Sequence, residues 1–328
     1  MKIGKVPENI LKRSVFKKLT VKRPEVMIHA GVGEDCAVLA PSMESIVLST
    51  DPITGTAKDI GNLAFHVTAN DIASSGAELV GMLLTIIFPP DSTEDELKQI
   101  MTDITRLADQ YEVEILGGHT EVSEAVTQTL VSVTGVGKVR PEQVVSTGGL
   151  RAGQDLVVTK WIGLEGTAIL AAEKEEELLQ KLPADLVETA REFSSLLSVV
   201  PDSKIAMENG VSAMHDVTEG GIFGALWEMA AASGVGIEAD LRKIPIRQET
   251  VEICEVFDIN PYMLISSGAL LIGSDHGSQL VDALKRVGIH GAVIGRATTG
   301  NDRVILNGEE RRFLEPPGTD ELFRALGS

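Results

Sequence analysis

Three short acidic motifs lie between residues 33 and 71, and each adjoins an apolar run. They are Gly33-Glu34-Asp35, Ser49-Thr50-Asp51-Pro52 and Asn70-Asp71. Carboxylates at the ends of core elements are costly to bury unless a cation neutralises them. Mg²⁺ binds a few carboxylates together with phosphate oxygens and water. The motifs therefore predict a magnesium–nucleotide site in which Asp35, Asp51 and Asp71 hold the metal.

Each of these residues also has an ordinary structural interpretation. Asp35 and Asp51 flank predicted strands, where aspartate is usually a turn residue. Asn70 and Asp71 lie three and four residues after Val67, on the helix face that packs inward, where they could cap a helix or join a buried polar network. Small residues around them let a ligand approach the backbone closely. The clustering of the three acids favours the metal site.

Two glycine pairs predict further contacts with anions. The Gly117-Gly118-His119-Thr120 segment allows close approach, and His119 could donate a hydrogen bond to a phosphate oxygen or be purely structural. Glu121 is a further candidate acid or base. In His215-Asp216-Val217-Thr218-Glu219-Gly220-Gly221 the glycines precede a predicted helix, whose free N–H groups could bind an anion. Thr218 or Asp216 could instead simply cap that helix.

Composition excludes several classes of protein. The formal net charge of −19 argues against nucleic-acid binding, which needs clustered Lys and Arg. Two cysteines, Cys36 and Cys254, form neither a disulfide framework nor a metal-ligand spacing, as expected in the cytoplasm. The longest apolar run, residues 82–88, is too short to span a bilayer, so we expect no membrane association.

Strand and helix patterns alternate along the chain. In the first half we expect strands at 36–40, 46–49, 82–88, 113–116 and 128–138, and helices at 61–76 and from an N-cap at Ser92 to about 110. The glycines between 148 and 153 mark a boundary, which gives domains 1–148 and 149–328. In the second half we expect strands at 155–159, 211–215 and 237–239 and helices at 166–172 and 222–232. The pattern indicates two α/β or α+β domains.

These motifs, in this order, resemble the aminoimidazole ribonucleotide synthetase superfamily. It includes thiamine-monophosphate kinase, selenophosphate synthetase and the hydrogenase-maturation carbamoyl dehydratase HypE, and the chain is most similar to HypE-like proteins. The resemblance also rests on the segments 3–7 and 163–171. It implies an N-terminal ATP-binding domain whose sheet pairs with its twin in a homodimer, and an α+β C-terminal domain.

The resemblance also implies ATP and Mg²⁺ as cofactors and suggests roles for particular residues. Metal positions are matched by Asp35, Thr50, Asp51 and Asp71. Nucleotide-contacting positions are matched by Lys5, Asn70, Asp71, Gly117, Gly118, His119, Thr120, Gly220 and Gly221. Asp216 and His119 are the catalytic candidates.

Two departures from HypE qualify this resemblance. HypE proteins end in Pro-Arg-Ile-Cys, whose cysteine carries the carbamoyl group, whereas this chain has no cysteine after Cys254. HypE also has a catalytic Glu in an Asn-Glu-Gly motif, where this chain reads Ser266-Ser267-Gly268. We therefore expect a HypE-like, Mg-dependent protein that uses ATP to activate an oxygen of a small substrate, without the carrier cysteine. The alternatives are a thiamine-monophosphate-type kinase and a catalytically silent nucleotide-binding regulator.

Overall fold

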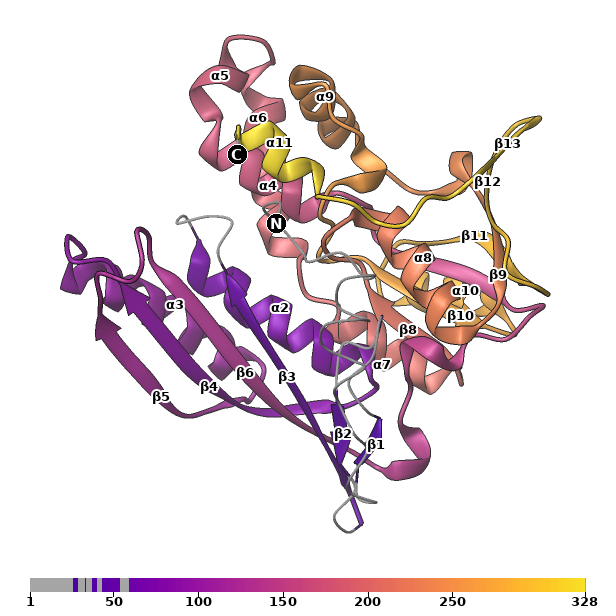
Figure 1. The fold of residues 1–328 in the computed structure, drawn as a ribbon, viewed down its shortest axis with the longest axis horizontal. Helices are drawn as coiled ribbons and strands as arrows, with labels where there is room; N and C mark the ends of the chain where they lie inside the picture. Colours follow the sequence, from indigo (N-terminus) through magenta and orange to yellow (C-terminus); the bar gives the residue numbers. More distant parts are fainter. Residues whose placement is uncertain (1–25, 29–32, 34–36, 40–42, 54–58, 328) are drawn as a thin grey trace.

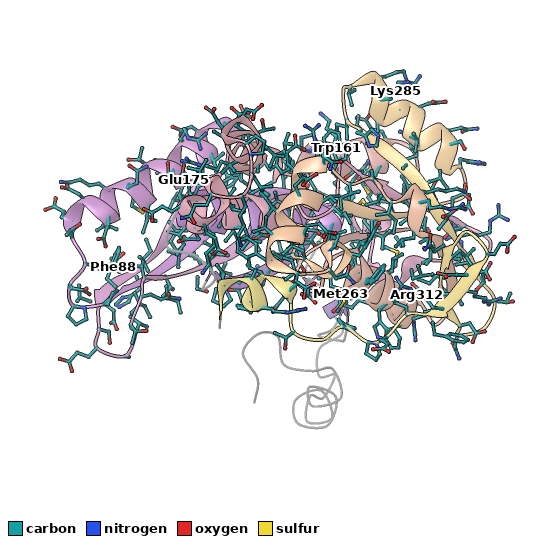
Figure 2. The ribbon with its side chains drawn as sticks, turned by 90° about the horizontal axis from the view of Figure 1, so that it is seen from above. Phe88, Trp161, Glu175, Met263, Lys285 and Arg312 are labelled. Carbon is teal, nitrogen blue, oxygen red and sulfur yellow. The ribbon has the colours of Figure 1, made fainter. Side chains whose placement is uncertain are left out.

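The computed structural model describes residues 26–28, 33, 37–39, 43–53 and 59–327. Two domains are visible in Figure 1, each built on one sheet. Figure 2 shows Phe88 in the N-terminal domain at one end of the molecule, and Lys285 and Arg312 towards the other. Two predicted site residues, Lys5 and Asp35, lie outside the described residues.

The N-terminal domain contains a six-stranded mixed sheet in the order β1-β2-β3-β6-β4-β5. All neighbouring strands are antiparallel except β4 and β5, which are parallel. The predicted strand at 113–116 is longer in the structure and includes Gly117 and Gly118, which were expected at its end. The strands are β1 (Val26–Ile28), β2 (Ala37–Leu39), β3 (Ser45–Ile53), β4 (Glu78–Phe88), β5 (Glu114–Val122) and β6 (Leu130–Val139).

Helices α2 (Ile60–Ser74) and α3 (Glu94–Gln110) pack on the sheet through a shared core. Thirteen residues of α2 are buried, because it lies between the sheet and the C-terminal domain. Helix α3 buries only one stripe and is otherwise exposed. Its N-cap is Thr93, whose hydroxyl accepts the Glu96 N–H at 3.3 Å, so the predicted cap at Ser92 is wrong by one residue.

The other face of this sheet carries exposed apolar side chains. Val80 and Leu83 of β4 and Leu116 of β5 are 40–47% exposed. The helices α2 and α3 pack instead against the side chains that alternate with these, such as Met82 and Leu84. The sheet therefore has one buried face and one that the described residues leave open.

The C-terminal domain contains a seven-stranded mixed sheet in the order β13-β12-β9-β11-β7-β10-β8. Its strands are β7 (Asp155–Thr159), β8 (Ala213–Asp216), β9 (Gly236–Asp240), β10 (Leu270–Ser274), β11 (Gly291–Thr298), β12 (Arg303–Asn307) and β13 (Glu310–Phe313). Its helices are α4 (Leu164–Glu173), α5 (Glu175–Leu179), α6 (Ala184–Arg191), α7 (Val200–Glu208), α8 (Gly221–Ser233), α9 (Gln248–Phe257), α10 (Gly277–Arg286) and α11 (Glu321–Leu326), with a 3₁₀ turn, η4 (Glu192–Leu196).

Both faces of this second sheet are covered. In β7, Leu156 and Val158 pack in the core that contains α8, whereas Val157 packs in the core that contains α7 and α10. Burial on both faces explains why the strand reads as an unbroken apolar run. Among the described helices, none is both long and apolar enough to cross a membrane.

Hydrogen bonds join the two domains along α2. The Asn70 side chain donates through Nδ2 to Leu197 O and accepts through Oδ1 from Val199 N–H, both at 2.8 Å. Ser203 Oγ donates to Ala73 O at 2.6 Å. Because Asn70 is fully buried, these bonds fix α2 against the start of α7.

Candidate magnesium and nucleotide site

Two of the predicted metal ligands meet at one hydroxyl group. Along β3, Ser49 and Asp51 point to the same face because side chains alternate on a strand. That face meets α2, which presents Asp71. Ser49 Oγ is hydrogen-bonded to Asp71 Oδ2 and lies 3.3 Å from Asp51 Oδ2. A serine hydroxyl has one proton, so it can donate to only one of the two carboxylates at a time.

This arrangement suits a hard divalent cation. Asp71 is 7% exposed and Asp51 is half-buried, so water screens their mutual repulsion only in part. The donor set of two carboxylates and a hydroxyl consists of oxygen atoms, which Mg²⁺ prefers. Among the described residues, no three His, Cys, Asp or Glu side chains are grouped as metal ligands. A two-carboxylate set fits Mg²⁺, which usually keeps water and phosphate oxygens as its other ligands.

Thr50 points away from this pair. It is exposed on the opposite face of β3, where its hydroxyl lies 2.9 Å from that of Thr134. Its predicted role at the metal therefore has no support from the position of its side chain.

Asn70 lies next to Asp71 but serves a different contact. Its side-chain oxygen and one N–H are used by the hydrogen bonds to Leu197 and Val199 between the domains. In the structure Asn70 therefore orients α2, and with it Asp71, by tying the helix to the C-terminal domain. Its predicted contact with the nucleotide stays a prediction.

The Gly117–Thr120 segment lies on the exposed edge strand β5. Gly118 has φ 152°, and a Cβ there would lie 1.9 Å from Leu84 O of β4, so close strand packing requires glycine. His119 is exposed, and its Nε2 lies 2.9 Å from Glu121 Oε2. Gly117, His119 and Thr120 are open to a ligand, and their predicted roles stay predictions.

The predicted anion site at Gly220 and Gly221 is already occupied by a side chain of the protein. The Gly220 N–H donates to Asp320 Oδ2 at 2.7 Å, and the Gly221 N–H donates to Thr218 O at 3.0 Å. These intramolecular bonds use the two N–H groups, and the expected phosphate contact at Gly220 and Gly221 stays a prediction. Gly221 has φ 60°, and a Cβ there would lie 2.7 Å from Leu264 O, which explains the glycine without a ligand.

Asp216, a predicted catalytic residue, is 1% exposed at the end of β8. Its neighbour His215 belongs to a buried polar group, with Nε2 3.1 Å from Glu228 Oε2 and Nδ1 3.4 Å from Thr147 Oγ1. A catalytic residue must touch substrate, and this burial gives no such access. The predicted catalytic role of Asp216 is thus unsupported by its placement.

Sequence reasoning did not single out Glu165, a buried carboxyl group near the start of α4. It is 5% exposed and Oε2 accepts the Ser267 N–H at 3.3 Å. Burial raises the pKa of Glu165 to about 7, an effect that contact with Ser267 opposes and that the charges of Asp320 and Glu219 reinforce. The sequence did offer a signal, because the charged Glu165 lies three positions before the apolar run Ala168–Ala171.

Comparison with known proteins identifies the family. Residues 33–139 match the N-terminal domain, and residues 151–307 the C-terminal domain, of AIR synthase related protein. The predicted domain boundary at 148/149 falls between these two matches. The chain is 28% identical over 340 residues to a putative hydrogenase expression/formation protein of Methanocaldococcus jannaschii, covering 98% of this chain and 96% of that one.

Solved structures with this fold include HypE proteins. Escherichia coli HypE is 25% identical, with a TM-score of 0.74, over 85% of this chain and 88% of that one. A hydrogenase maturation protein HypE in complex with ATP is 20% identical, with a TM-score of 0.69, over 85% of this chain and 87% of that one, a likeness of fold alone. From the paired domain matches and these similarities, the chain belongs to the AIR synthase-related family.

Proposed function

We propose that this chain is a Mg²⁺-dependent enzyme that uses ATP to activate an oxygen atom of a small substrate by phosphoryl transfer. The observation that carries the proposal is the convergence of Asp51 and Asp71 on the Ser49 hydroxyl. Membership of the AIR synthase-related family supports it, as does a HypE of the same fold crystallised with ATP.

Asp51 and Asp71 would hold Mg²⁺, together with Asp35. The metal would supply charge neutralisation on the phosphate oxygens. The protein's own contribution is positioning, since β3 fixes Asp51 while the Asn70 contacts to Leu197 and Val199 fix the helix that carries Asp71. Lys5 would contact the nucleotide. His119 and the Gly117–Gly118 edge lie on β5, which β6 and β4 separate from β3, and their contact with the nucleotide stays a prediction.

The activated oxygen would belong to a separate substrate, and not to a carbamoyl group carried on this chain's own Cys254. That thiol is 1% exposed, and burial raises its pKa to about 12, so the reactive thiolate is scarce at neutral pH. Cys254 is therefore unsuited to carry a carbamoyl group. We infer a separate substrate, as in a small-molecule kinase.

We also propose that two copies associate through the open face of the N-terminal sheet. Val80, Leu83 and Leu116 form an exposed apolar patch on β4 and β5. Large exposed apolar patches usually mark interaction sites. A second copy would cover this patch isologously, as in most homodimers.

Calorimetric titration with ATP and Mg²⁺ tests the metal site. Asp51→Asn and Asp71→Asn should each weaken Mg-ATP binding at least about tenfold, roughly 1.4 kcal/mol, because one charged ligand becomes neutral. Asp95→Asn, which removes an exposed charge on α3, is the control and should leave the affinity unchanged. Thr50→Val decides whether that side chain contributes.

Wild-type affinity in both Asp51→Asn and Asp71→Asn would remove the carboxylate pair from the metal site. Tight ATP binding without turnover in the presence of trial substrates would instead favour a nucleotide-binding regulator.

A further inference from the structure

A cavity of about 520 Å³ lies where α2 meets the C-terminal domain, and we call it the α2–α4 cavity. Glu165, Ala168, Ile169 and Ala172 line it at the i, i+3, i+4 and i+7 spacing of one face of α4. Its volume is within the range of small-molecule sites, roughly 300–1,000 Å³. The side chain of Glu165 therefore extends from the helix face that forms the cavity wall.

Much of this wall is apolar. Leu63 of α2 faces the alanine and isoleucine side chains of α4, and Leu197 closes the same wall after η4. The wall can accept a hydrocarbon group, whose burial is favourable by about 25 cal/mol per Å².

Glu165 is the polar group set into this apolar wall. Its Oε2 accepts the Ser267 N–H at 3.3 Å, and no described basic side chain neutralises the carboxylate. A buried carboxylate is unfavourable unless a cation neutralises it. A ligand that brings a hydrogen-bond donor and a positive charge would satisfy it.

The rim of the α2–α4 cavity is negatively charged, like Glu165. Asp59, Glu188 and Glu192 add three carboxylates to that of Glu165. Among the described lining residues the one basic side chain is Arg191, and its Nη1 is already paired with Glu175 Oε1 at 2.8 Å. An excess of carboxylates repels phosphates and attracts cations, so the cavity disfavours the phosphate chain of ATP.

We propose that the α2–α4 cavity binds a small organic cation, a primary ammonium or amidinium on a short hydrocarbon chain. Its charged group contacts the Glu165 carboxylate, and its hydrocarbon part packs against Leu63, Ile169 and Leu197. The proposal does not depend on ATP use, because neither Asp51 nor Asp71 lines the cavity.

Three matched probes test the proposal on the full chain without nucleotide: n-butylammonium, n-butanol and butyrate. Their affinities are measured by ligand-detected NMR titration at about pH 8, where Glu165 is ionised. We expect n-butylammonium to bind at least about tenfold more tightly than n-butanol, and butyrate to give no saturable binding.

Glu165→Gln should weaken n-butylammonium binding at least about tenfold and leave n-butanol binding unchanged, because only the charge contact is lost. Glu188→Gln is the matched control, since it removes an exposed carboxylate from the same cavity and should change affinity less than about twofold. Ala172→Leu, on the half-buried part of α4, should narrow the cavity and weaken binding of both probes.

Three results would overturn the proposal. If butyrate bound as tightly as n-butylammonium, a cation site would be excluded. Equal losses in the Glu165→Gln and Glu188→Gln variants would mean that a diffuse field, not a contact with Glu165, attracts the probe. Unchanged binding in Ala172→Leu, whose folding does not depend on the Glu165 contact, would place the probe elsewhere.

Discussion

Replacing Glu165 by glutamine should make the stability of the protein less sensitive to pH. The side chain keeps its size and can still accept the Ser267 N–H, but it can no longer ionise. In the native protein burial raises the pKa of Glu165 to about 7, against 4.5 for an ordinary glutamic acid. The variant therefore isolates the cost of ionising one buried carboxyl group.

The sign follows from the direction of that shift. As pH rises from 4.5 towards 7, the unfolded chain releases this proton while the folded protein keeps it, so stability falls. Below this window Glu165 contributes no penalty, and above it the penalty is complete. A shift of about 2.5 pKa units corresponds to roughly 3 kcal/mol. The free energy of unfolding of Glu165→Gln, minus that of the native protein, should therefore rise by about 3 kcal/mol from about pH 4 to about pH 8.

Urea denaturation followed by tryptophan fluorescence measures this difference. The two tryptophans, Trp161 and Trp227, both lie in the C-terminal domain and report its unfolding. Other titrating groups, Asp320 among them, are common to both proteins and largely cancel. Glu188→Gln, which removes an exposed carboxylate of the same cavity, is the control variant. A pH-independent difference for Glu165→Gln would refute the reasoning about its burial.

Three further predictions concern other parts of the molecule. Asp202→Asn should destabilise the protein by about 3–5 kcal/mol, because it leaves the buried Lys160 ammonium without the carboxylate that it contacts at 2.6 and 2.7 Å. The loss is measured as a lower urea midpoint, and a loss near zero would show that Lys160 is neutral or finds another partner. Incubation with ATP and a carbamoyl-transfer partner should add no carbamoyl or cyano group to Cys254, and a mass increase mapped to it would contradict the inaccessibility of its thiol. Light scattering at micromolar concentration should give twice the chain mass of 35.0 kDa, and Leu83→Asp should give a monomer that still binds Mg-ATP; a monomeric native protein that binds ATP would contradict the proposed dimer.

The elements with strong local signals were predicted closely. The strand at 155–159 has the predicted bounds, and α8 extends the predicted 222–232 by one residue at each end. Glycines flank both segments and interrupt the periodicity, which makes their ends visible in the sequence. In β5 the same reasoning failed, because Gly117 and Gly118 lie within the strand. A Cβ at Gly118 would lie 1.9 Å from Leu84 O of β4, so this glycine reflects a contact between distant parts of the chain.

The candidate site was predictable only where its residues share a local pattern. The inward face of α2 predicted that Asp71 is buried, and strand alternation explains why Asp51 meets it while Thr50 does not. The hydrogen bond between Asp320 and Gly220 could not be predicted, because nothing near either residue identifies a partner one hundred positions away. Glu165 was missed because its burial comes from tertiary packing of α4.

The contact between Asp320 and α8 also bears on the order in which the C-terminal domain can be completed. Asp320 accepts N–H groups from Gly220, Ile265 and Leu322, so one carboxylate joins the N-terminus of α8, the segment before β10 and the start of α11. On the ribosome, the strands and helices from β7 to β13 emerge before this carboxylate does. Until residue 320 has been made, the N-terminus of α8 lacks its hydrogen-bond acceptor. The final packing of this domain must therefore follow synthesis of α11, and release of the segment after β13 would uncap α8 without breaking any strand pairing of the sheet.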